Sequence, residues 1–288
     1  MNINYVFDIS SEEEIDKLSN WKSISSNPNN WRLCVARERY LELEHFVKKG
    51  HALFFNKKTG QITDPDFNPV STSGSVLVAR TDIDTYTHMM MTPHPWCTDR
   101  ASYEKIEGWY NFVPPNYIGR RFEVTTPREI TSIGLDYFIN RWKNENGDFF
   151  VKSIKKEFSY NGSPKGFREF GVAYSLETGA DNKEIMFQEC LVLKEDDEDT
   201  LEYRCFYLFG RLLSISRYHD YISLPVPQDV WDLARRYEKE IVSSILPETV
   251  VIDIFDTNRG LIFGEANALP CSGRYVDITL DSFPLVRE

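Results

Sequence analysis

Three oxygen-bearing side chains near the C-terminus have the types and the spacing of a site for a hard cation. Asp253, Glu265 and Asn267 fall in two short apolar strands on either side of a turn. A three-residue turn at 258–260, with Gly260 in the left-handed bulge position, places Asp253 opposite Glu265. Because side chains alternate along a strand, Asn267 shares the face of Glu265. The three side chains are therefore predicted to form one patch.

Two interpretations of this patch remain open from the residues alone. Opposed carboxylates in adjacent strands repel each other, and apolar neighbours on the same face make an unpaired arrangement costly. A bound Mg²⁺ would remove that cost, since it takes a few protein oxygens and leaves its other positions to phosphates and water. The alternative is a polar hairpin edge that faces solvent, with Asp253 shifted by one residue onto the other face.

The elements that must position this hairpin indicate an α+β fold with antiparallel sheets. Helices are predicted at 31–49, from a capping box that begins at Thr126, and between Pro227 and Pro247. Strands follow one another with the helices set apart, so a doubly wound parallel sheet is not expected. The helix after Thr126 has an apolar stripe of Ile130, Ile133, Tyr137 and Trp142. The predicted strands are 52–55, 74–79, 148–154, 171–176, 185–194, 202–209, 212–218, 249–255 and 261–267.

The patterns divide the chain near residue 120. Residues 1–120 are predicted to form a smaller N-terminal α/β region, and residues 121–288 the domain that carries the hairpin. The segment 87–115 follows no regular period and is predicted to be loop-rich, either as part of a substrate cleft or as irregular core packing. A polar loop is predicted at 159–166.

The composition excludes several kinds of partner and site. A formal net charge of −11 with no basic segment argues against a nucleic-acid partner. The five cysteines are dispersed and odd in number, and the five histidines lack ligand spacing, so neither a disulfide framework nor a zinc site is expected. No signal peptide or membrane span is recognisable, which predicts a soluble cytoplasmic protein without a membrane partner. Walker, dinucleotide-binding, kinase and nucleophile-elbow motifs are missing.

Four segments, in order, resemble the ATP-grasp superfamily. Asp253 with the run Glu265-Ala266-Asn267 is similar to the metal-binding Asp and Glu-x-Asn that close ATP-grasp domains. Lys152 and Lys156 resemble the phosphate-contacting lysine strand and the flexible loop after it, although Ser153 stands where proline is common. The resemblance covers about residues 147–275.

The two middle segments point to a subgroup. The run Gln188-Glu189-Cys190-Leu191 resembles the hinge strand whose backbone pairs with adenine. Arg204 and Arg217 lie on the next two strands. Together with Lys152 they most resemble the clade marked by two arginines and a lysine, and the eukaryotic cell-division-cycle ATP-grasp proteins that assist assembly of a translation initiation factor.

The resemblance implies a nucleotide site with a role for each of these residues. Lys152 would hold the α- and β-phosphates, and from the residues alone it can equally be an exposed strand lysine. The backbone of 188–191 would bind adenine, and either Glu189 or Glu202 would accept hydrogen bonds from the ribose. The ligands of Mg²⁺ would be Asp253, Glu265 and Asn267.

The arginines would handle charge during the reaction. Arg204 and Arg217 would neutralise the charge of the phosphoryl group as it moves. From the residues alone, Arg204 can instead belong to a buried ion pair, and Arg217 can equally be a surface arginine. After the hairpin, Ser272 and Arg274 are predicted to hold the acceptor carboxylate.

The implied activity is that of an ATP- and Mg²⁺-dependent ligase. It would activate a carboxylate as an acyl phosphate, release ADP and pass the acyl group to an amine. Its partners would be a carboxylate-bearing small molecule or peptide and an amine acceptor, with residues 1–120 setting the specificity and residues 121–288 forming the ATP-grasp domain. Two other functions stay open: an ATP-binding assembly factor with a protein partner, and a phosphotransferase on the same fold.

Overall fold

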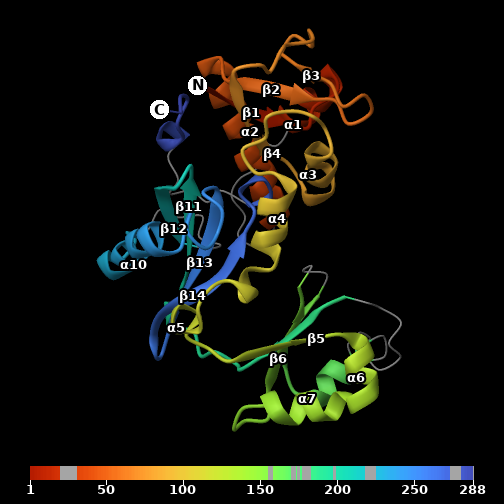
Figure 1. Ribbon diagram of the computed structural model, residues 1–288, viewed down its shortest axis with the longest axis vertical. Coiled ribbons are helices and arrows are strands. Elements are labelled where there is room, and N and C mark those ends of the chain that lie inside the picture. Colours follow the sequence, from red (N-terminus) through yellow and green to blue (C-terminus); the bar gives the residue numbers. More distant parts are fainter. Residues whose placement is uncertain are drawn as a thin grey trace.

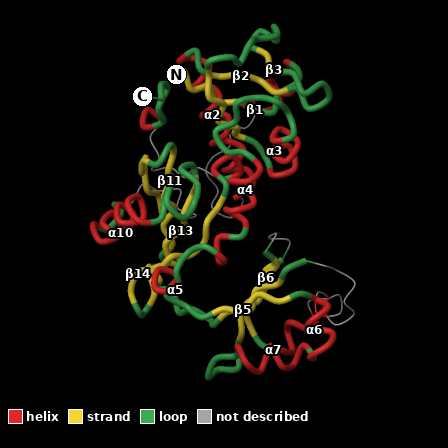
Figure 2. The backbone as a smooth tube through the Cα atoms, in the orientation of Figure 1, coloured by secondary structure: helices red, strands yellow, loops and turns green. Residues whose placement is uncertain are grey.

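Three four-stranded sheets follow one another along the long axis of the molecule, with helices beside each of them (Figure 1). The computed structural model describes residues 1–19, 31–154, 158–169, 173, 176, 183–196, 199–217, 225–272 and 280–287. Figure 2 shows the N-terminal sheet at one end, the sheet of the C-terminal hairpin in the middle and the third sheet at the other end. This arrangement confirms the α+β class with antiparallel sheets and a preceding α/β region.

The N-terminal sheet has the order β3-β2-β1-β4 and is mainly parallel. β1 (Asn2–Phe7) is parallel to β2 (Ala52–Phe55) and β4 (Ser75–Arg80), whereas β3 (Ile62–Thr63) is antiparallel to β2. Most of β1 is buried, as is usual for a parallel strand covered on both faces. α1 (Glu12–Ser19) and α2 (Trp31–Lys49) lead from β1 to β2, and α2 agrees with the prediction. The C-terminal segment with η4 (Leu280–Ser282) returns here, where Val286 bridges Asn2.

The prediction of a loop-rich segment at 87–115 is wrong for much of its length. α3 (Ile83–Met90) and α4 (Arg100–Glu107) begin at the N-caps Asp82 and Asp99, whose carboxylates accept backbone N–H groups. η2 (Trp109–Asn111) and α5 (Pro115–Ile118) follow. Helices of eight residues or fewer are too short to show an apolar period in the sequence. α4 and α5 pack against the last hairpin strand, β14 (Gly260–Asn267).

The third sheet has the order β5-β8-β6-β7, and all its pairs are antiparallel. The predicted polar loop at 159–166 is instead a strand and the start of helix α8 (Pro164–Glu169). The predicted strand at 171–176 lies mostly outside the described residues, and Ala173 and Leu176 within it are helical. The strands of this sheet are β5 (Phe122–Thr125), β6 (Phe149–Ser153), β7 (Ser159–Gly162) and β8 (Ile185–Gln188).

Two helices cover one face of the third sheet. α6 (Pro127–Ile133) begins with the predicted capping box, in which Thr126 and Glu129 each bond the other's backbone N–H. Gly134 then separates it from α7 (Leu135–Trp142), so the predicted single stripe is wrong. Ile133 and Tyr137 are exposed, and Phe138 packs on the sheet in their place.

The central sheet has the order β12-β11-β13-β14 and carries the predicted hairpin. Its strands are β11 (Glu202–Leu208), β12 (Arg211–Arg217), β13 (Val250–Thr257) and β14, which match the predicted ranges to within two residues. α10 (Gln228–Glu240) covers one face. β9 (Glu195–Asp196) and β10 (Asp199–Thr200) form a separate ribbon, and η3 (Leu269–Cys271) follows β14. Within the described ranges, no helix has both the length and the apolarity needed to cross a membrane.

Candidate functional site

The C-terminal hairpin pairs Asp253 with Glu265 as predicted, although the predicted turn is wrong. The turn holds two residues instead of three, and the extra residue lies in a bulge at Gly264, where the pairing register shifts. A Cβ atom at Gly264 would lie 2.7 Å from the Phe255 ring and 2.8 Å from the carbonyl oxygen of Asp253. This position therefore requires glycine, and the bulge brings the two carboxylates to opposite positions.

Asp253 is fully buried, and Arg204 compensates its charge. Arg204 lies opposite Asp253 on β11 and donates to both carboxylate oxygens, from Nε at 2.8 Å and from Nη2 at 2.9 Å. Asn267 Nδ2 donates to Asp253 Oδ2 at 2.7 Å, which shows that these two residues share a face. The buried ion pair considered for Arg204 is thus present, with Asp253 as its partner.

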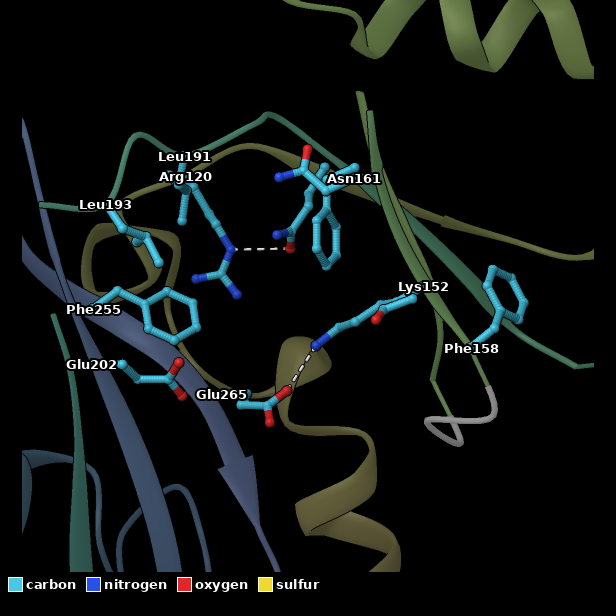
Figure 3. A pocket seen from close by; sticks show the side chains of 12 residues that line it. Arg120, Lys152, Phe158, Asn161, Leu191, Leu193, Glu202, Phe255 and Glu265 are labelled. Atoms are coloured by element: carbon cyan, nitrogen blue, oxygen red, sulfur yellow. Dashed lines mark hydrogen bonds and ion pairs between the residues drawn. The ribbon is translucent and has the colours of Figure 1, made fainter. Parts of the chain in front are cut away.

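Lys152 joins the third sheet to the central hairpin. Its Nζ lies 2.8 Å from Glu265 Oε2, and both side chains are mostly buried. In Figure 3, Lys152 extends from its strand toward Glu265. The repulsion expected between Asp253 and Glu265 is therefore relieved by two cations of the protein itself.

A cavity of about 550 Å³ lies between the central and third sheets. Its volume is within the usual range of small-molecule pockets, about 300 to 1,000 Å³. Figure 3 shows charged groups of Arg120, Lys152 and Glu265 around a common space. The lining residues are Arg120, Phe150, Lys152, Phe158, Ser159, Asn161, Gln188, Leu191, Leu193, Glu202, Phe255 and Glu265.

Arg120 is a buried cation in this cavity that the sequence does not single out. Its guanidinium donates to three neutral acceptors: Gln188 Oε1 at 3.1 Å and the carbonyl oxygens of Phe263 and Gly264. Burial lowers the pKa of Arg120 to about 10, against the attraction of Glu265 and other acidic groups. In the described part of the chain no carboxylate forms an ion pair with it, so an anion in the cavity would stabilise this charge.

The two candidate ribose acceptors differ in position. Glu202 lines the cavity, whereas Glu189 does not. Glu189 Oε1 accepts from the backbone N–H of Arg121 at 2.8 Å and lies 3.2 Å from Arg259 Nη2. Its carboxylate is therefore already bound by the protein.

The rest of the predicted hinge follows the cavity edge. Gln188 ends β8, and Gln188 and Leu191 both line the cavity. Cys190 lies beside them, with its Sγ 3.5 Å from Asn161 Oδ1. The run 188–191 thus borders the cavity, and its contact with adenine stays a prediction.

A second cavity of about 300 Å³ adjoins the first, because Lys152 and Glu265 line both. The lysine–glutamate pair is their common wall. The other lining residues come from α4, the residues after it, the third sheet and the end of the hairpin: Tyr103, Ile106, Glu107, Trp109, Ile154, Met186, Ala266, Asn267, Ala268, Cys271 and Ser272.

The loop after β14 is held by a buried ion pair from the N-terminal sheet. Arg80 and Glu42 form two hydrogen bonds, of 2.7 and 2.8 Å, and each side chain is at most 2% exposed. Arg80 also donates to the carbonyl oxygens of Leu269 and Ser272. Ser272, predicted to contact the acceptor, lines the second cavity while its hydroxyl donates to Ala268 O.

Of the three remaining predicted site residues, the structure describes only Arg217, and it lies away from the cavities. Arg217 pairs with Tyr203, which places it on the face opposite to Arg204, and it lines neither cavity. Its role at the phosphates stays a prediction. Lys156 and Arg274 lie outside the described residues. The described ranges contain no cluster of three or more His, Cys, Asp or Glu side chains suited to a metal, whereas the predicted set has two carboxylates and an amide.

The chain resembles solved ATP-grasp structures over almost its whole length. No protein-family model and no curated protein matches its sequence. A RimK domain ATP-grasp protein from Sphaerobacter thermophilus matches with a TM-score of 0.54 and 12% identity, over 93% of this chain and 91% of that one. D-alanyl-alanine synthetase A from Vibrio cholerae gives 0.53 and 15%, over 96% and 92%. Macrocyclase MdnC from Microcystis aeruginosa, bound with precursor peptide MdnA, gives 0.51 and 12%, over 94% and 92%. The chain therefore has the ATP-grasp fold.

Proposed function

We propose that this chain is an ATP- and Mg²⁺-dependent ligase that joins a carboxylate to an amine through an acyl phosphate. The pair Lys152–Glu265 carries the proposal, because it lines both cavities. A nucleotide in the larger cavity and an acceptor in the smaller one would meet at this pair, where a phosphoryl group has to cross. The fold supports this, since one solved neighbour is a D-alanyl-alanine synthetase and another is a macrocyclase bound with a precursor peptide.

The larger cavity suits ATP in both volume and charge. Arg120 and Lys152 would bind phosphate oxygens, as charge-assisted donors do. The backbone of 188–191 would bind adenine. Glu202 would accept the ribose hydroxyls, and we prefer it to Glu189 because Glu202 lines this cavity and Glu189 does not.

Glu265 and Asn267 suit a Mg²⁺ ion better than Asp253 does. Both offer oxygen atoms and line the second cavity, and Asn267 turns its Nδ2 toward Asp253, which directs its amide oxygen elsewhere. Both oxygens of Asp253 accept from Arg204, and Oδ2 also accepts from Asn267, so fewer acceptor positions remain on Asp253 for a cation. When bound, Mg²⁺ would neutralise phosphate charge.

The reaction requires positioning and electrostatics and no covalent protein nucleophile. A carboxylate oxygen of the substrate would attack the γ-phosphorus, and ADP would leave with the electrons of the broken P–O bond. The amine nitrogen would then attack the acyl carbon, inorganic phosphate would leave with the C–O electrons, and the nitrogen would lose a proton. Arg204 would act by holding Asp253 and Asn267 in place. Arg217, Lys156 and Arg274 stay predicted contacts.

Calorimetric titration of MgATP tests the nucleotide site. The wild type is expected to bind MgATP, and Glu265→Ala to lose that binding. Asp232→Ala is the matched control, because Asp232 is exposed on α10 and lines neither cavity. Absence of binding by the wild type would overturn the proposal.

Product analysis then separates the ligase from its alternatives. With ATP and a panel of carboxylates and amines, the ligase should release ADP and phosphate together with a new amide. A stable phosphorylated product would point to a phosphotransferase. Stoichiometric capture of a protein partner without ADP release would point to an assembly factor.

A further inference from the structure

The second cavity is lined by a further carboxylate, that of Glu107. Glu107 ends α4, lines the cavity and accepts a hydrogen bond from the Tyr103 hydroxyl at 2.8 Å. Across the described ranges, no Lys or Arg forms an ion pair with Glu107, whereas Glu265, which also lines this cavity, is paired with Lys152. A half-buried carboxylate is stabilised when a cation joins it, so the cavity favours a positively charged ligand.

The remaining walls limit the size and polarity of such a ligand. Ile106, Trp109, Ile154 and Met186 make most of the lining apolar. A volume of about 300 Å³ corresponds to about ten water molecules, at the lower end of ligand pockets. The cavity therefore admits a group about as large as one amino-acid residue.

We propose that the second cavity selects the amine acceptor. Glu107 binds the primary ammonium of a ligand whose apolar body is about the size of one amino-acid residue. The transfer of an acyl group to that amine rests on the proposed function. Tyr103 is a positioning residue, because its hydroxyl holds one oxygen of Glu107. In the reaction the ammonium gives one proton to Glu107, and the neutral nitrogen forms the C–N bond at the acyl carbon. Inorganic phosphate leaves with the C–O electron pair and takes the second proton from the nitrogen.

Two cysteines report the occupancy of the two cavities separately. Cys271 lines the second cavity, and Cys190 lies beside the first. Alkylation with iodoacetamide near pH 8, followed by mass spectrometry of the peptides, measures both thiols in one sample. Burial raises the pKa of Cys97 to about 11, so this third thiol stays protonated and slow to react.

Phenethylamine is the probe, and 2-phenylethanol is its uncharged counterpart. Phenethylamine is expected to protect Cys271, and 2-phenylethanol to protect it much less. Glu107→Gln should raise the amine concentration for half-protection at least about tenfold, because a charge-assisted hydrogen bond is lost. Glu104→Gln is the matched control, since Glu104 lies on the same helix and is exposed. Tyr103→Phe should weaken the protection of Cys271 but keep the preference for phenethylamine over 2-phenylethanol. This second variant keeps the proposal testable if Glu107→Gln fails to fold.

The tripeptide phenylalanyl-glycyl-glycine distinguishes the sources of the amine. Protection by the tripeptide as well as by phenethylamine assigns a peptide acceptor, and protection by phenethylamine alone assigns a free small amine. Equal protection by amine and alcohol, or unchanged protection in Glu107→Gln, would overturn the assignment. In the same samples MgATP should protect Cys190. If MgATP fails to protect Cys190 while phenethylamine still protects Cys271, the nucleotide site is refuted. If phenethylamine fails to protect Cys271 while MgATP still protects Cys190, the role of Glu107 is refuted.

Discussion

Replacing Arg120 by methionine should weaken MgATP binding far more than it lowers stability. Without nucleotide, burial lowers the pKa of Arg120 to about 10, and the drop from the ordinary value corresponds to a cost of about 3 kcal/mol for keeping the charge. Methionine removes this cost but leaves Gln188 Oε1 and the carbonyl oxygens of Phe263 and Gly264 without their donor, at about 1 to 2 kcal/mol each. The free energy of unfolding should therefore fall by less than about 3 kcal/mol.

Nucleotide affinity should respond differently, because the same guanidinium would pair with a phosphate. Losing one member of a close charge pair costs about 2 to 4 kcal/mol, or about 30-fold to 700-fold in Kd. Calorimetry of MgATP binding and urea unfolding of the ligand-free protein measure the two quantities on one variant. Arg121→Met is the matched control, since the Arg121 side chain is 81% exposed. Unchanged affinity, or a stability loss above about 5 kcal/mol, would refute this role for Arg120.

Three further predictions concern the scaffold of the site. Asp253→Asn should lower the free energy of unfolding by about 3 to 5 kcal/mol in urea, because it leaves the charge of Arg204 buried without its counterion; a loss below about 1 kcal/mol would contradict this. Gly264→Ala should lower the free energy of unfolding by about 1 to 3 kcal/mol and also weaken MgATP binding, because its Cβ would lie 2.8 Å from a backbone oxygen. A variant with the MgATP affinity and stability of the wild type would disprove the tight packing at the bulge. Hydrogen bonds from the Thr125 hydroxyl and the capping-box backbone lower the pKa of Glu129. The ionised carboxylate therefore stabilises the folded protein above the ordinary glutamate pKa, and this contribution is lost as the pH falls through the pKa that Glu129 has in the folded state. Glu129→Gln should therefore make the free energy of unfolding depend less steeply on pH in this acid range, and an unaltered pH profile would argue against the effect.

The hairpin register was predictable because it depends on counting residues between two strands. One extra residue brings Asp253 opposite Glu265 whether it lies in the turn or in a bulge. From the sequence, either Gly260 or Gly264 could be this extra residue. The choice depends on close packing around Gly264, including the Phe255 ring, and no local pattern records such packing.

Arg120 and Glu107 lie beyond what sequence reasoning can find. Arg120 is buried against the carbonyl oxygen of Phe263, which is 143 positions away, whereas its neighbour Arg121 has the same chemistry but is exposed. Glu107 ends a helix of eight residues, whose length hides any apolar period. The family resemblance, by contrast, singles out Lys152, which does line the cavity, although its partner Glu265 comes from another sheet.

The two ion pairs explain how a charged site can stay folded without its ligand. Arg204 and Asp253 are 7% and 0% exposed, whereas Lys152 and Glu265 are 15% and 17% exposed and line both cavities. In the proposed complex, the outer pair would therefore be the one that exchanges partners, Lys152 for a phosphate oxygen and Glu265 for a cation. Such an exchange replaces one charge contact by two and leaves no charge buried alone. The inner pair would remain in place and keep Asn267 oriented throughout.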